Sequence, residues 1–160
     1  MRHILNVIGP PAVGKSTVIR SLNEYLPDYE VWAIDDIRLQ KASPEREAEV
    51  WREIWVAALK ADGTIIESSG TSPHLLLLSD RLWRAPGTHI FTVALEAPLR
   101  ICRQRDRQRQ NDTGEQPAGV YTEKWVPLPE LAIGLSIRTA GKTPSQTVSE
   151  ILEKLPPDFR

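Results

Sequence analysis

The sequence is poor in the features that define several classes of protein. Cys102 is the single cysteine among 160 residues, so an internal disulfide is excluded and a reducing compartment is expected. Apolar runs such as Leu75–Leu78 are far too short to cross a bilayer, and Gly9 and Pro10 interrupt the N-terminal run too early for a signal peptide. The formal net charge of −1 gives no overall attraction to nucleic acid or membrane surfaces. We therefore expect a cytoplasmic protein that does not bind membranes.

The length and composition are those of one ordinary globular domain covering residues 1–160. A chain of 160 residues with 41% hydrophobic and 26% charged residues buries enough surface to fold without disulfides or metals. The three histidines, His3, His74 and His89, do not have the sequence spacing of metal ligands, and a zinc site is not expected.

Strand-like and helix-like segments alternate along the chain. Apolar, β-branched runs predict strands at 3–8, 30–34, 64–67, 89–95 and 134–137. Helical spacing and capping residues predict helices at 15–26, 44–61 and 73–84, with two more beginning at Pro98 and Pro144. This order predicts an α/β fold with a parallel sheet covered by helices on both faces. The polar residues 110–120 are a candidate mobile loop.

Residues 9–16 read Gly-Pro-Pro-Ala-Val-Gly-Lys-Ser and fit the P-loop (Walker A) pattern G-x-x-x-x-G-K-[ST]. The glycines allow the backbone to curl, so that successive N–H groups point at phosphate oxygens. Lys15 supplies charge for the β- and γ-phosphates, and the Ser16 hydroxyl can ligate Mg²⁺. The expected contacts with ATP are Gly9, Ala12, Val13, Gly14, Lys15, Ser16 and Thr17.

A chance glycine-rich turn is the alternative, but the motif lies between an apolar strand and an amphipathic helix, the context that supports a P-loop. A guanine-reading N-K-x-D motif is missing, which disfavours a GTPase. The chain is also too short for the additional domain of a hexameric ATPase.

The chain resembles the small P-loop kinases: shikimate and gluconate kinases, adenylate-kinase-like enzymes, zeta-toxin-type kinases and the 5′-kinase domain of polynucleotide kinases. The resemblance covers most of the chain. It rests on the P-loop, the Asp35-Asp36-Ile37-Arg38 segment, an arginine-rich helix before a polar stretch, and a final loop and helix. It implies a three-layer α/β/α fold with a five-stranded parallel sheet in the order 2-3-1-4-5, and ATP bound across the carboxyl ends of the strands.

The resemblance also implies roles for the segment after the second strand. Asp35 would lie beside the acceptor hydroxyl, orient it and take its proton, while Arg38 would bind a negative group of the acceptor. The alternative is that Asp35 or Asp36 caps the next helix and that Arg38 is solvated.

Glu67 ends the third expected strand and is followed by Ser68-Ser69-Gly70-Thr71. An acid after an apolar strand is suited to hold Mg²⁺ in the manner of a Walker B carboxylate, although a capping role fits equally well. Glu67 and Ser69 are therefore candidates for the acceptor site, and Glu67 and Ser16 for the metal. Shikimate kinases have a glycine-rich turn here, so this sequence departs from that branch.

Five arginines crowd the segment after Pro98: Arg100, Arg103, Arg105, Arg107 and Arg109. In the kinase interpretation, a lid at about 107–120 closes over the phosphates, and Arg105 and Arg109 are the candidates to stabilise the transferred group. The alternatives are a solvated helix face or, less favoured, a nucleic-acid patch.

Two further groups of residues have weaker interpretations. Thr139 and Gly141 follow the last strand, where the family has its adenine-contacting loop. The tryptophans are expected mainly in the core, although Trp51 and Trp55 are candidates to line an acceptor pocket.

The sequence thus favours an ATP- and Mg²⁺-dependent kinase that acts on a small-molecule or nucleotide acceptor. The alternatives are a polynucleotide 5′-kinase and a nucleotide-binding regulator or ATPase without kinase activity. The acceptor and the oligomeric state are left open by the sequence.

Overall fold

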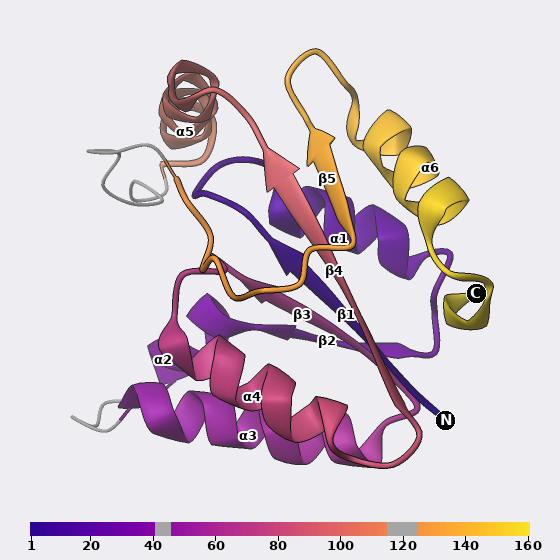
Figure 1. Cartoon of the computed structure of the whole chain (residues 1–160). Helices are drawn as coiled ribbons and strands as arrows, with labels where there is room; N and C mark the ends of the chain where they lie inside the picture. Colours follow the sequence, from indigo (N-terminus) through magenta and orange to yellow (C-terminus); the bar gives the residue numbers. More distant parts are fainter. Residues whose placement is uncertain (41–45, 115–124) are drawn as a thin grey trace.

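The structure, a computed structural model, describes residues 1–40, 46–114 and 125–160 and contains helices and strands in alternation (Figure 1). The strands are β1 (Arg2–Ile8), β2 (Tyr29–Ala33), β3 (Gly63–Ser68), β4 (Thr88–Glu96) and β5 (Leu135–Arg138). The helices are α1 (Lys15–Asn23), α2 (Ile34–Gln40), α3 (Arg46–Lys60), α4 (Pro73–Trp83), α5 (Leu99–Thr113), α6 (Pro144–Lys154) and the short 3₁₀ helix η1 (Pro157–Phe159).

The described strands form a five-stranded sheet in the order β2-β3-β1-β4-β5, and every neighbouring pair is parallel. This confirms the predicted fold, that of a P-loop NTPase with helices on both sides of the sheet. β1 lies in the centre, between β3 and β4, so the loop that follows it opens at the middle of the carboxyl edge.

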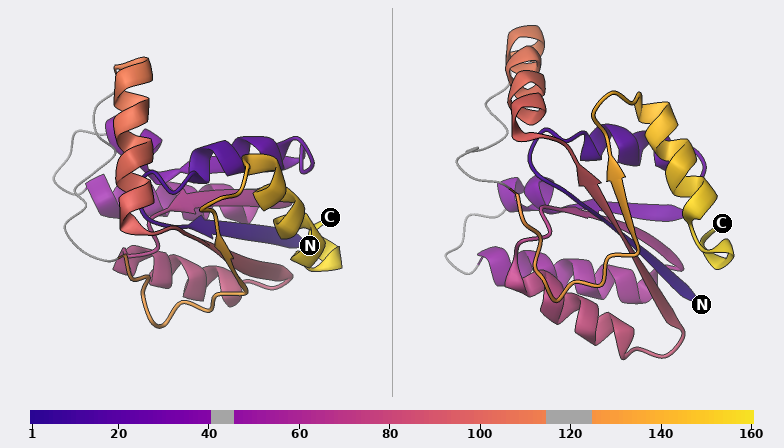
Figure 2. Two further views of the ribbon diagram at one scale, coloured as in Figure 1. Left: turned by 90° about the horizontal axis from the view of Figure 1, so that it is seen from above. Right: turned by 45° about the horizontal axis from the view of Figure 1, so that its top comes forward.

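Helices cover both faces of the sheet (Figures 1 and 2). α1 and α6 pack together on one face, while α2, α3 and α4 cover the other. β1 serves both faces because successive side chains of a strand point in opposite directions: Leu5 and Val7 belong to the core under α1 and α6, whereas Ile4 and Ile8 belong to the core under α3 and α4. Burial on both faces explains why Ile4, Leu5, Val7 and Ile8 are all apolar.

α5 differs from the other long helices because it projects from the carboxyl edge of the sheet instead of covering a face (Figure 2). Cys102 and Asp106 are its buried residues, and the remaining side chains are mostly polar and exposed. The predicted loop over 110–120 is wrong for residues 110–113, which are helical. The helix continues there because the Thr113 hydroxyl donates to the Arg109 carbonyl and Gly114 supplies a left-handed C-cap. Residues 115–120 lie outside the described part.

Other boundaries also differ from the sequence-based expectation. α1 ends at Asn23 and not at Leu26, because the amides of Tyr25 and Leu26 both bond the Leu22 carbonyl in a turn. α2 was not predicted; with seven residues it is too short for its periodicity to stand out. The last strand is shifted by one residue. The helix expected over 44–61 is observed over residues 46–60, and residues 44 and 45 lie outside the described part.

Among the described residues, none of the helices is both long enough and apolar enough to cross a membrane.

Gly70 occupies a position that other residues cannot adopt without strain. It has a φ of +75°, and an added Cβ would lie 2.8 Å from Cδ1 of Ile8 in the core. We expect Gly70→Ala to lower the free energy of unfolding by about 2–4 kcal/mol, through left-handed strain and overpacking together. Urea unfolding measures this.

Gly87 is the matched control for this substitution. Its φ is +69°, but no atom lies within 4 Å of the added Cβ. Gly87→Ala should cost only the backbone strain of about 1–2 kcal/mol. Equal losses for the two variants would contradict the packing argument.

Candidate functional site

The loop between β1 and α1 is shaped to surround an anion. Ala12 and Gly14 have φ values of +56° and +106°, which turn the backbone so that its N–H groups converge, and α1 begins immediately afterwards. Gly9 sits where a side chain has no room, because an added Cβ would lie 2.7 Å from the Leu95 carbonyl oxygen. The geometry of the loop fits a phosphate chain, aided by the positive end of the α1 dipole.

Lys15 lies inside this loop. Its Nζ donates to the carbonyl oxygens of Gly9 and Pro10, each at 3.0 Å. Burial lowers the pKa of Lys15, and the negative charges of Glu67 and Asp35 partly oppose this. The ammonium group is thus held by carbonyl dipoles and two nearby acids, within the loop that would receive the phosphates.

Ser16 and Glu67 meet opposite the lysine. The Ser16 hydroxyl donates to Oε1 of Glu67 at 2.8 Å, although the two residues are 51 positions apart. Strand register explains the meeting: Val7 pairs with Glu67 in the parallel β1–β3 ladder, so both strands deliver their next residues to one edge. A hydroxyl and a carboxylate side by side are hard oxygen ligands, and this donor set fits Mg²⁺.

The environment of Glu67 perturbs its ionisation. Burial raises the pKa of its carboxyl above the ordinary value of 4.5, and the charges of Asp35 and Asp36 raise it further. The bond from Ser16 and the charge of Lys15 act in the opposite direction. A divalent cation would relieve the repulsion among these carboxylates.

Asp35 and Asp36 are exposed in the first turn of α2, beside the same edge. β2 brings them there, because Ala33, at its end, pairs with Glu67. Ile34 and Ile37 are buried and fix the helix against the core. The structure therefore places the predicted acceptor aspartate near the phosphate loop. Arg38 belongs to α2, but its side chain lies outside the described part.

Arg105 lies where α5 starts to leave the body of the protein, and it links two loops. One nitrogen donates to the Val13 carbonyl at 2.8 Å and to the Thr139 hydroxyl at 3.0 Å, and the other donates to the Thr139 carbonyl at 3.0 Å. The buried Thr139 hydroxyl also donates to Val13 at 3.1 Å. Arg105 and Thr139 thus hold the P-loop against the loop that contains Gly141, whose φ is +77°.

The remaining arginines of α5 have different surroundings. Arg109 donates to Oδ1 of the buried Asp106 at 2.8 Å, and the side chain of Arg109 is partly exposed. Arg100, Arg103 and Arg107 are exposed. Of the two candidates, Arg105 is fixed against the P-loop and Arg109 is held within its own helix; a catalytic role for either stays a prediction.

Ser69 lies in the turn after β3, and its hydroxyl is 2.7 Å from that of Thr71. A distant segment braces this turn: Trp125 donates its indole N–H to the Ser69 carbonyl at 2.8 Å, and the Leu128 amide donates to the Gly70 carbonyl at 2.9 Å. Sequence reasoning assigned Trp125 to the core and missed this contact, because no local pattern links positions 56 residues apart.

The two tryptophans considered for an acceptor pocket pack within the helical layer. Trp51 is 4% exposed and donates to Oε1 of Glu47 at 3.0 Å. The Arg81 guanidinium lies 5.2 Å from the centre of the Trp55 ring. Trp51 is thus a core residue, and a role for Trp51 or Trp55 in an acceptor pocket stays a prediction.

Comparison with known families agrees with this geometry. A family model described as an AAA domain matches residues 4–125, and the chain belongs to that family. No curated protein matches the sequence significantly.

The solved structures that share the fold include several kinases. APS kinase CysC of Mycobacterium tuberculosis, solved with AMPPNP and APS, is 19% identical, with a TM-score of 0.69 over 96% of this chain and 97% of the other. A gluconokinase of Sinorhizobium meliloti 1021 is 17% identical, with a TM-score of 0.69 over 97% and 93%. The Pnkp1/Rnl/Hen1 RNA repair complex matches at 20% identity and a TM-score of 0.58, over 72% of this chain and 40% of the other.

The contacts of Arg105 predict a loss of stability on its removal. Arg105→Ala should lower the free energy of unfolding by about 2–3 kcal/mol, because hydrogen bonds from a charged group to Val13 and Thr139 are lost. Arg107→Ala, two positions away and exposed, should change it by less than about 0.5 kcal/mol. Urea unfolding compares the two, and similar values would contradict the linking role.

The raised pKa of Glu67 predicts a dependence of stability on pH. Between the ordinary value of 4.5 and the raised pKa, the folded state binds more protons than the unfolded state. The free energy of unfolding of the wild type therefore loses this contribution as the pH rises through that window. Glu67→Gln should lack the loss, so the difference in free energy of unfolding between the variant and the wild type should change in favour of the variant as the pH rises through that window.

Urea unfolding at several pH values, without Mg²⁺ or nucleotide, tests this expectation. Glu153→Gln removes a negative charge from an exposed position on α6 and controls for net charge. A difference between Glu67→Gln and wild type that is independent of pH would count against the assignment.

Proposed function

We propose that this protein is an ATP- and Mg²⁺-dependent kinase that transfers the γ-phosphate to a hydroxyl or phosphate of a small-molecule or nucleotide acceptor. The observation that carries the proposal is the convergence at one sheet edge of Lys15, the Ser16–Glu67 pair and Asp35. Phosphoryl transfer needs little covalent chemistry from the protein, and depends on positioning and charge stabilisation.

On this proposal the P-loop and Thr17 bind the phosphates, and Lys15 moves from the Gly9 and Pro10 carbonyls to the β- and γ-phosphate oxygens. The exchange is favourable because a charged phosphate is a stronger acceptor than a carbonyl group. Ser16 and Glu67 hold Mg²⁺, which would neutralise the phosphate charge when bound.

Asp35 acts on the acceptor side. Its position at the start of α2, near Lys15 and Glu67, suits a group that orients a hydroxyl and accepts its proton. Arg38 and Ser69 supply further acceptor contacts. Arg105, which lies against the P-loop, and Arg109 stabilise the transferring phosphoryl group. Thr139 and Gly141 border the adenine.

The solved structures that share this fold support the proposed class of acceptor. One neighbour of this fold was solved with a nucleotide analogue and APS, and another is a gluconokinase. Both acceptors named in these structures are small molecules, which favours the same class here. The RNA repair complex with the same fold in part of its chain supports polynucleotide 5′-kinase as the second candidate.

The deciding experiment measures transfer of labelled γ-phosphate from ATP with Mg²⁺ to a panel of acceptors: nucleosides and their monophosphates, sugar acids, antibiotics and 5′-hydroxyl oligonucleotides. Lys15→Ala should abolish ATP binding. Asp35→Asn should lower kcat by about 10²–10⁴-fold and leave ATP binding intact, because it removes a proton acceptor alone.

Asp36→Asn is the matched control, one residue further along the same exposed turn, and its kcat should stay within about threefold of wild type. Equal loss of ATP binding and turnover in Asp35→Asn would reassign that residue to metal binding or folding. Tight ATP binding without transfer to any acceptor would favour the regulator alternative.

A further inference from the structure

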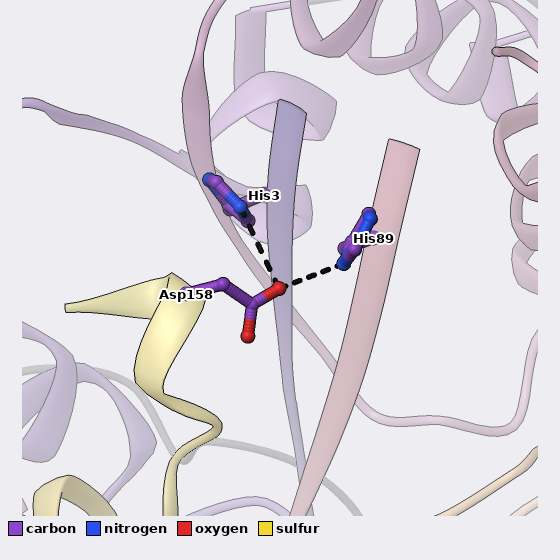
Figure 3. A group of neighbouring side chains, drawn as sticks. All are labelled: His3, His89 and Asp158. Atoms are coloured by element: carbon purple, nitrogen blue, oxygen red, sulfur yellow. Dashed lines mark ion pairs between the residues drawn. The ribbon is translucent and has the colours of Figure 1, made fainter. Parts of the chain in front are cut away.

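At the amino end of the sheet, opposite the P-loop, three side chains converge from three separate elements (Figure 3). His3 comes from β1, His89 from β4 and Asp158 from η1. One atom from each, a ring nitrogen or a carboxylate oxygen, lies within 4.8 Å of the other two. The cluster has no part in the candidate kinase site, which occupies the other edge.

The strands determine the placement of the histidines. His3 and His89 are direct partners in the parallel β1–β4 ladder, so their side chains project side by side from one face of the sheet. The rings lie edge to face, with centroids 5.7 Å apart. Asp158 reaches the same point because Phe159 is buried beside His3 and because the Tyr29 hydroxyl donates to the Phe159 carbonyl at 3.0 Å.

The distances to the carboxylate suit a shared ion. Oδ2 of Asp158 lies 2.7 Å from Nδ1 of His89 and 3.8 Å from Nε2 of His3. Ligands of a tetrahedral zinc ion, with bonds of about 2.0–2.1 Å, lie about 3.4 Å apart. The two observed distances lie on either side of that value, and all three ligand atoms lie within 4.8 Å of one another. Changes of up to roughly 1.5 Å in the separations between the ligand atoms would therefore place all three around one ion.

A second observation points to an occupant. Nε2 of His3 is a buried atom with no hydrogen-bond partner in the described part of the chain. At 3.8 Å, Asp158 is too distant to accept a hydrogen bond from it. Buried polar atoms are normally satisfied, and a cation between this nitrogen and the carboxylate would satisfy it.

We propose that His3, His89 and Asp158 bind one divalent cation of the zinc class. Two imidazole nitrogens and one carboxylate oxygen form a donor set for zinc and its first-row neighbours and disfavour Mg²⁺ and Ca²⁺, which prefer oxygen ligands. Water completes the coordination, because His89 and Asp158 are partly exposed. The ion fastens η1 to β1 and β4, and so fixes the C-terminal residues against the sheet.

Zinc titration of the full-length protein without a histidine tag, in excess Mg²⁺, tests the proposal by calorimetry. The expected result is one Zn²⁺ per chain, with affinity lowered at least about tenfold in both His89→Gln and Asp158→Asn, because each removes or weakens a ligand. His74→Gln is the matched control on α4 and should bind as wild type. ATP binding should be unchanged in His89→Gln, which lies far from the P-loop.

Imidazole NMR spectra of the wild type give a readout that does not depend on variants. Zn²⁺ should move the resonances of His3 and His89 and leave those of His74 in place, and it should slow amide exchange at Phe159 and Arg160. Absence of zinc binding, equal shifts at all three histidines, or binding that survives in both His89→Gln and Asp158→Asn would overturn the proposal.

Discussion

The parallel pairing of β1 with β3 and β4 is the constraint on which the candidate site depends. Because the three strands run in the same direction, the segments that follow them all emerge at one edge of the sheet. The P-loop follows β1, the Ser69 turn follows β3 and α5 follows β4. A change of register by one residue would move Glu67 away from Ser16 and turn its side chain to the other face.

The site concentrates charges that are costly to bury singly. Burial removes water from both Lys15 and Glu67, which costs free energy. The attraction between their opposite charges offsets part of that cost. The hydroxyl of Ser16 and the carbonyls of the loop supply the remaining hydrogen bonds. On the proposed function, phosphates would meet the lysine and a metal ion would meet the carboxylate, so each ligand charge would face an opposite one.

Long-range contacts connect the site to parts of the chain that lie far away in sequence. Arg105 reaches the P-loop across 92 positions, and Trp125 reaches the Ser69 turn across 56. Both residues donate to backbone carbonyls and therefore act on the conformation of the loops. The opposite edge of the sheet has a comparable arrangement, in which η1 is held against β1 and β4.

Much of the molecule followed from local pattern. The P-loop, the alternation of strands and helices, and the prolines that begin α4 and α6 were readable from the sequence, because each depends on neighbours within a few positions. The sheet order was predicted through the family resemblance and confirmed by the structure. The extension of α5 through Thr113 was missed, since a polar segment has no apolar periodicity to reveal a helix.

The sequence by itself therefore determined the phosphate-binding loop and the class of fold. Only the tertiary structure decided which distant side chains meet: the partners of Arg105, the hydrogen bond of Trp125, and the convergence of His3, His89 and Asp158. The physical reason is that these contacts depend on strand register and chain path, which bring together residues that no local spacing relates.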